Sequence, residues 1–152
     1  MFTIDASIHL NAVNPTEEGS AESQAFLQQL RDQSCPTFSP TLLLVEVATA
    51  VARARNDANR GIAIARAIRG IPSQVWVPLD DALADDAAQL GAYHHLRGAD
   101  AVYAAVAQRH GTTLITLDRQ QLERLSSAMT VLTPAQALER LNKLSKAEKR
   151  RT

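Results

Sequence analysis

RGADAVYAAVAQRHGTTLITLD, residues 97–118, combines one helix with one strand and decides the fold class of this chain. Small and apolar residues dominate from Asp100 to His110, which predicts a helix, and Gly111 is a residue type that commonly ends one. TTLIT, residues 112–116, is rich in β-branched residues and predicts a short buried strand. A helix that leads directly into such a strand is typical of α/β proteins with a parallel sheet.

The same alternation of strand and helix patterns continues on both sides of this segment. Further strands are predicted at FTID (residues 2–5), TFS (37–39), QVWVPL (74–79) and TVL (130–132). Further helices are predicted at about residues 21–32, 40–56, 59–69 and 81–95, after Asp118, and from Pro134. We therefore expect an α/β fold with a mainly parallel central sheet that helices cover on both faces.

Capping residues support several of these boundaries. Ser39 before Pro40, and Thr133 before Pro134, each match an N-cap residue followed by proline in the first helical turn. Gly70 matches the residue that follows a helix. No repeat, linker or composition shift divides the chain, so one domain is predicted at residues 1–142, followed by a basic C-terminal tail at 143–152 (KLSKAEKRRT).

The composition fits one globular domain in a reducing compartment. With 152 residues, of which 45% are hydrophobic and 21% charged, the chain is long enough to bury a core without disulfides. Cys35 is the single cysteine, so no intramolecular disulfide is expected, and the N-terminus lacks the pattern of a signal peptide. No apolar run reaches the ~20 residues that a membrane span needs. A cytoplasmic protein without a membrane partner is expected.

The charge pattern gives only weak support for a nucleic-acid partner. The formal net charge is zero, so nothing steers nucleic acid to the molecule as a whole, and aromatic residues make up only 4%. So few aromatics argue against modules that stack bases on aromatic platforms. Basic residues do gather locally, at five arginines between residues 53 and 69 and in the C-terminal tail. Such groups are also typical of solvated helix faces.

Four carboxylates stand at the ends of apolar runs or inside them, where a charge is costly without a partner. They are Asp5 after FTI, Glu46 within TLLLVEVATAV, Asp100 within GADAVYAAVA and Asp118 after TTLITL. Because parallel strands end at the same edge of a sheet, Asp5 and Asp118 are expected to meet there, with Asp100 at a helix N-terminus beside them. Oxygen ligands without Cys or His favour Mg²⁺ or Mn²⁺, and such ions serve phosphoryl transfer.

Glu46 carries the most information among the four. It is expected to share a buried helix face with Leu42 and Leu43, and no Lys or Arg precedes Arg53 on that helix. A metal ion is therefore an attractive partner, although an arginine from elsewhere in the chain would also serve. The other three carboxylates have local alternatives: Asp5 capping the next turn, Asp100 complementing a helix dipole, and Asp118 forming a capping-box variant with Gln121.

The motifs around these residues resemble PIN-domain ribonucleases, in particular VapC-like toxins of bacterial toxin–antitoxin pairs. The resemblance covers nearly the whole chain and is carried by IDAS (residues 4–7), VEVATAVAR (45–53) and RGADAVYAAVAQRHGTTLITLD (97–118). It implies a three-layer α/β/α PIN fold related to the Rossmann type. By similarity, the catalytic acidic residues that hold one or two Mg²⁺ or Mn²⁺ ions are Asp5, Glu46, Asp100 and Asp118, with supporting hydroxyls at Ser7 and Thr116.

The resemblance also implies an activity and partners. The activity is endonucleolytic cleavage of RNA, such as transfer or ribosomal RNA, by metal-activated water, leaving a 3′-hydroxyl and a 5′-phosphate. Arg97, close to Asp100, is a candidate to hold a substrate phosphate, although it is equally interpreted as a surface arginine. The implied partners are a VapB-type antitoxin and a second copy in a homodimer. Many relatives carry a further aspartate shortly after Asp118, where this chain has Gln120 and Gln121, which puts a second metal position in doubt.

Two other functions fit the same residues. A binding or scaffold module would keep the PIN fold with a degenerate metal site, and it would bind Mn²⁺ poorly. A Rossmann-like phosphatase would use Asp5 as its nucleophile. Such phosphatases usually have a second aspartate two residues further on, where this chain has Ser7.

Overall fold

A parallel sheet forms the centre of the structure, a computed structural model that describes residues 1–149, with side chains through residue 143. The strands are β1 (Phe2–Ile4), β2 (Thr37–Pro40), β3 (Gln74–Val77), β4 (Thr113–Ile115) and β5 (Val131–Leu132). The helices are α1 (Ala6–Ala12), α2 (Ser20–Asp32), α3 (Leu42–Arg55), α4 (Ala58–Arg69), α5 (Asp81–His94), α6 (Gly98–His110), α7 (Arg119–Arg124) and α8 (Pro134–Lys149). The strand order is β3-β2-β1-β4-β5, and each neighbouring pair is parallel.

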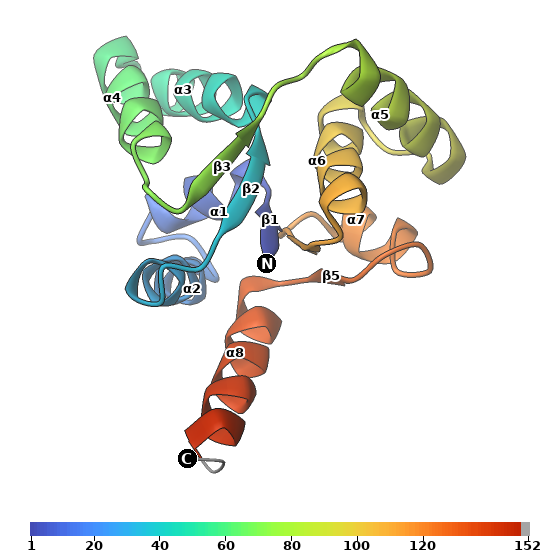
Figure 1. Cartoon of the computed structure of the whole chain (residues 1–152). Coiled ribbons are helices and arrows are strands. Elements are labelled where there is room, and N and C mark those ends of the chain that lie inside the picture. Colours follow the sequence, from blue (N-terminus) through green and yellow to red (C-terminus); the bar gives the residue numbers. More distant parts are fainter. Residues whose placement is uncertain (150–152) are drawn as a thin grey trace.

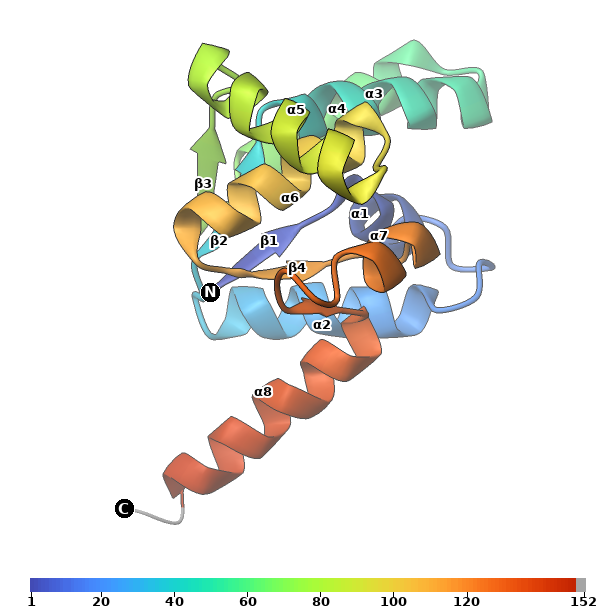
Figure 2. The same ribbon diagram turned by 90° about the vertical axis from the view of Figure 1, so that its right-hand side faces the viewer.

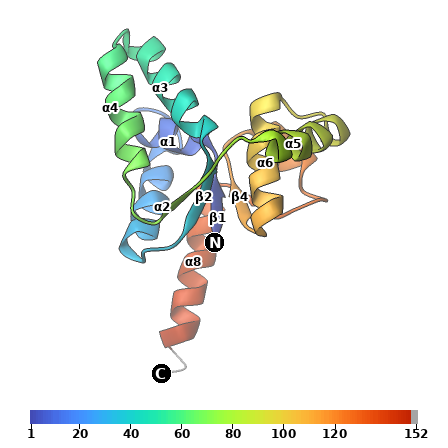
Figure 3. The ribbon, with the colours of Figure 1, turned by 45° about the horizontal axis from the view of Figure 1, so that its top comes forward.

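Helices cover both faces of this sheet. Figures 1 and 3 show α1 to α4 on one side and α5 to α7 on the other. One apolar cluster surrounds α6, where Tyr103 and Val106 are fully buried, and a second packs Ile4 and Phe26 between the sheet, α2 and α8. The predicted three-layer α/β/α fold with a mainly parallel sheet is confirmed, and the described strands are all parallel.

The first strand leads directly into a helix that the sequence patterns did not predict. Asp5 occupies the N-cap position of α1 in an extended conformation, and α1 is only seven residues long. Its sequence, ASIHLNA, is too short for helical periodicity to stand out, which explains the omission. The direct β1–α1 connection places Asp5 and Ser7 together at the carboxyl end of β1.

The predicted helix start at Ser39 and Pro40 is wrong. Both residues belong to β2, where they pair with Trp76 and Val77 of β3, and the Ser39 hydroxyl donates to the carbonyl oxygen of Ile4. Pro40 is the last residue of the strand, and the pairing of β2 with β1 already ends at Phe38, so no residue of β1 pairs with it. The helix itself starts two residues later than predicted.

Other predicted boundaries agree more closely with the structure. The Thr133 hydroxyl accepts from the backbone N–H of Gln136 at the start of α8, while the Gln136 side chain accepts from the Thr133 N–H, so this helix start is confirmed. Gly111 ends α6 with a φ of +59°, a left-handed conformation that suits glycine. Gly70 follows α4 as predicted, but its φ of −81° requires no glycine.

Helix α8 extends beyond the predicted domain boundary. Ala137 and Leu141 of its first half pack against the second apolar cluster, and the helix continues to Lys149, into the segment predicted as a basic tail. Figure 2 shows its C-terminal half projecting away from the sheet. The last three predicted tail residues, 150–152, lie outside the described part of the chain. Within the described part, no helix is long and apolar enough to cross a membrane.

Candidate active site

Asp5 and Asp118 meet at the carboxyl edge of the sheet, as the sequence predicts. Strands β1 and β4 are parallel neighbours with Ile4 opposite Ile115. Asp5 follows β1 directly, and Asp118 follows β4 by three residues, as the N-cap of α7. The strand order reverses between β1 and β4, and such a reversal is where open α/β sheets form ligand sites.

The Asp5 carboxylate is buried and held by three side-chain donors. Its Oδ2 accepts hydrogen bonds from Ser7 Oγ at 2.9 Å and Thr116 Oγ1 at 2.6 Å, the two hydroxyls that the family resemblance singles out. The third donor is the amide of Gln121, with Nε2 at 3.1 Å. The other oxygen, Oδ1, accepts no hydrogen bond from the described side chains, and Asp5 lines an open cavity.

The two hydroxyls also tie Asp5 to the loop between β4 and α7. Ser7 Oγ accepts from the backbone N–H of Leu117 at 3.2 Å, and Thr116 Oγ1 accepts from the backbone N–H of Asp118 at 3.0 Å. Each hydroxyl therefore donates to the carboxylate and accepts from the loop. This pairing fixes the position of Asp118 relative to Asp5.

Gln121 is a residue of this site that the sequence interpretation missed. Its side chain is fully buried, and Nε2 donates both to Asp5 and to Asp100 Oδ1, each at 3.1 Å. Its Oε1 has no hydrogen-bond partner among the described residues. The sequence treated Gln121 only as a partner in the cap of α7, and its backbone N–H does donate to Asp118 Oδ1 at 3.0 Å. Nothing local to the sequence shows that the same side chain spans two carboxylates.

Arg97 joins the remaining two aspartates. Its Nε lies 2.8 Å from Asp100 Oδ2, and its Nη2 lies 2.6 Å from Asp118 Oδ2. Asp100 sits in the first turn of α6, with Arg97 at the N-cap position of the same helix. The guanidinium therefore balances two of the four carboxylates, while its own side chain stays 67% exposed.

Glu46 enters the site from α3 and is half-buried. Tyr103 of α6 donates its hydroxyl to Glu46 Oε2 at 2.5 Å. This hydroxyl is a neutral partner that the sequence did not indicate, because Tyr103 and Glu46 lie 57 positions apart. The predicted buried helix face is only partly correct, since Leu43 is buried but Leu42 is half-buried and Thr49 is exposed.

Burial sets the protonation behaviour of these groups. Desolvation raises the pKa of Glu46 above its usual range, and the charges of Asp5 and Asp100 add to this effect, while the Tyr103 hydrogen bond opposes it. Desolvation also raises the pKa of Asp100, in spite of the opposing contact with Arg97. The pKa of Tyr103 is raised as well, first by burial and then by Glu46, so its hydroxyl stays a donor.

All four predicted carboxylates line one cavity of about 300 Å³. Ser7, Arg97 and Arg53 line the same cavity. Two hollows of about 420 and 770 Å³ lie elsewhere, beside α4, and contain none of the four.

The described side chains do not form a ready-made metal cluster. No three Asp, Glu, His or Cys side chains among them are grouped closely enough to hold one ion. The cause is visible in the hydrogen bonds, because Arg97 and Gln121 each span two carboxylates and satisfy them from within the chain.

The donor set nevertheless fits a hard divalent cation. Four carboxylates share one cavity with a single bridging guanidinium, and Asp5 Oδ1 accepts no hydrogen bond from the described side chains. Carboxylate oxygens are the ligands that Mg²⁺ and Mn²⁺ prefer. Asp5, Glu46, Asp100 and Asp118 are the residues that would hold such an ion.

The chain belongs to the PIN domain family, whose model matches residues 2–128. The match contains all four carboxylates, Ser7, Arg97 and Thr116. No curated protein matches the sequence.

Solved structures with the same fold include toxins and toxin–antitoxin complexes. VapC20 of Mycobacterium tuberculosis, described as a sarcin–ricin loop cleaving toxin, is 17% identical with a TM-score of 0.67, over 86% of this chain and 97% of that one. FitAcB of Neisseria gonorrhoeae is 21% identical with a TM-score of 0.66, over 88% and 98% of the two chains. A toxin–antitoxin complex from Klebsiella pneumoniae contains a chain that is 18% identical with a TM-score of 0.64, over 88% and 98%. At these identities the likeness establishes the fold, and the predicted similarity to VapC-type PIN proteins is confirmed at that level.

Proposed function

We propose that this protein is a Mg²⁺- or Mn²⁺-dependent endoribonuclease. The observation that carries the proposal is the position of Asp5, Glu46, Asp100 and Asp118, which line one cavity where the strand order of a PIN-domain sheet reverses. A bound divalent ion would lower the pKa of a coordinated water and stabilise negative charge on a phosphodiester.

The residues of the chain have distinct roles in this proposal. Ser7, Thr116 and Gln121 hold Asp5 through its Oδ2, which leaves Oδ1 without a side-chain donor. Arg97 is the cation nearest the carboxylates, and its exposed guanidinium is suited to hold a phosphate oxygen of the substrate.

We extend the proposal to a toxin that a VapB-type antitoxin neutralises. Support comes from the structural neighbours, several of which are complexes of a toxin with its antitoxin. A cavity rich in carboxylates also suits a basic side chain from such a partner. A homodimer and a cytoplasmic location complete the proposal, and the single cysteine, Cys35, suits a reducing compartment.

The test is cleavage of total cellular RNA by the purified protein, with new 5′ ends mapped by sequencing. Discrete cuts are expected with Mg²⁺ or Mn²⁺, none with EDTA, and none from an Asp100→Asn variant. Asp86→Asn is the matched control, because Asp86 pairs with Arg109 outside the cavity. Cuts that persist in Asp100→Asn would contradict the proposal. Weak Mn²⁺ binding together with no cleavage would instead favour the scaffold alternative.

A further inference from the structure

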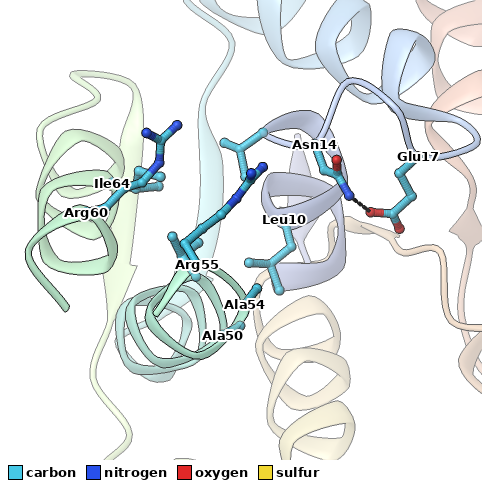
Figure 4. A pocket seen from close by; sticks show the side chains of 10 residues that line it. Leu10, Asn14, Glu17, Ala50, Ala54, Arg55, Arg60 and Ile64 are labelled. Carbon is cyan, nitrogen blue, oxygen red and sulfur yellow. Dashed lines mark hydrogen bonds between the residues drawn. The ribbon is translucent and has the colours of Figure 1, made fainter. Parts of the chain in front are cut away.

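A groove lined by two arginines adjoins the carboxylate cavity along α3. The groove, of about 420 Å³, lies between α1, α3 and α4, and Leu10 and Ala50 line both the groove and the cavity. Figure 4 shows Arg55 reaching from α3 toward α1, and Arg60 extending from α4 beside it. The groove and the carboxylate cavity therefore adjoin at Leu10 and Ala50.

Arg53 is the third arginine of this region and lies on α3. It lies seven residues after Glu46, so the two side chains share one face of α3 about 10.5 Å apart along the helix axis. Arg53 lines the cavity with the carboxylates, and Arg55 lies one half-turn further on.

These three arginines are available to a ligand. All three are exposed, and none forms an ion pair with a described residue. The one carboxylate in the groove is Glu17, which accepts a hydrogen bond from Asn14 at 3.3 Å. Asp57 accepts from the backbone N–H of Arg60 as the cap of α4 and leaves the guanidinium free.

We infer that the arginines at 53, 55 and 60 form a subsite for the phosphate backbone of a single-stranded RNA whose scissile bond lies in the carboxylate cavity. This subsite rests on the proposed function. Charge favours a polyanion such as RNA as the occupant of the groove, because the two free guanidinium groups of Arg55 and Arg60 face one carboxylate there, Glu17. The groove has no aromatic lining, so binding depends on phosphate contacts and is tolerant of sequence.

The packing of α3 against α4 holds the arginines at this spacing. Gly61 of α4 lies so close to the Ala48 carbonyl oxygen that a Cβ at this position would collide with it. The close approach brings Arg60 on the first turn of α4 beside Arg55 on the last turn of α3.

The test is the affinity for a labelled single-stranded RNA of about 12 nucleotides, measured by fluorescence anisotropy in EDTA so that no cleavage occurs. The variant is Arg55→Ala with Arg60→Ala. The matched control, Arg66→Ala with Arg69→Ala, removes the same charge from the last turn of α4, outside the groove. Thermal melts of all three proteins check that the fold is intact.

The expected loss follows from counterion release. With a slope of about −0.7 per phosphate contact on a single strand, losing two contacts lowers affinity about 60-fold in 50 mM salt and about tenfold in 200 mM. The salt slope itself becomes shallower by about 1.4. The RNA affinity of the control variant should stay close to that of the wild type.

Unchanged RNA affinity in the Arg55 and Arg60 variant, or an equal loss in the control, would overturn the subsite. The groove would then suit a protein partner instead. Failure of the proposed function gives a different result, because a protein that never cleaves RNA can still bind it through these arginines in EDTA.

Discussion

Replacing Arg97 by glutamine is expected to tighten the binding of Mn²⁺ in the absence of RNA. The guanidinium now occupies the place between Asp100 and Asp118, at 2.8 and 2.6 Å, so a divalent ion has to displace it. Glutamine removes the charge and leaves a shorter, neutral polar side chain. The carboxylates would then be left without their cation and would gain more from an added ion.

The size of the effect can be worked out from these two ion pairs. Each involves a guanidinium that is 67% exposed, so solvent screening limits each pair to about 0.2–1 kcal/mol. Losing both makes metal binding more favourable by about 0.4–2 kcal/mol, which is about a 2- to 30-fold increase in affinity. Arg97→Lys keeps the charge but not the planar guanidinium. Its affinity for Mn²⁺ should therefore lie between those of the wild type and Arg97→Gln.

The assay is calorimetric titration with MnCl₂ at about pH 8, where protonation of the carboxylates does not compete. Arg109→Gln is the control, because Arg109 pairs with Asp86 outside the cavity. Cleavage of RNA should fall in Arg97→Gln while metal affinity rises, since the variant also lacks the proposed phosphate contact. Equal or weaker Mn²⁺ binding in Arg97→Gln would refute the idea that this arginine and a metal compete for the same carboxylates.

Three further predictions concern single buried side chains. Gln121→Leu should lower the free energy of unfolding by about 1–3 kcal/mol in EDTA, because two buried carboxylates lose a hydrogen-bond donor. Saturating Mn²⁺ should reduce this loss of stability. Urea melts in EDTA that are equal for the variant and the wild type would contradict the prediction. His9 is buried with its pKa lowered to about 4, so the folded state disfavours the proton that the unfolded chain takes up below about pH 6.5. Stability should therefore fall by about 3 kcal/mol between pH 6.5 and 4, and His9→Leu should remove this dependence while the exposed His95→Asn retains it. Tyr103→Phe should raise the pKa of Glu46 further, so that Mn²⁺ binding is lost at a higher pH as the solution is acidified; an unshifted binding profile would exclude this role.

The sequence predicted the parts of the site that depend on strand ends. Asp5 and Asp118 follow short apolar strands, and parallel strands necessarily end at one edge of the sheet, so their meeting required only the right strand order. Asp100 was expected beside them because helix N-termini face that edge. The errors lie where the local signals were short or ambiguous, as at α1, with seven residues, and at Pro40, which ends a strand rather than starting a helix.

The contacts between the carboxylates and their partners were decided only by the tertiary structure. Gln121 reaches an aspartate 116 positions away, and Tyr103 reaches Glu46 across 57 positions, so no local pattern contains either contact. The sequence alone determined the α/β class and the placement of acidic groups at the sheet edge, because strand periodicity and chain direction are local properties. Its motifs added the resemblance to the PIN family. The three-dimensional packing decided which donors satisfy each carboxylate, since a buried charge takes whichever polar group the folded chain brings within hydrogen-bond distance.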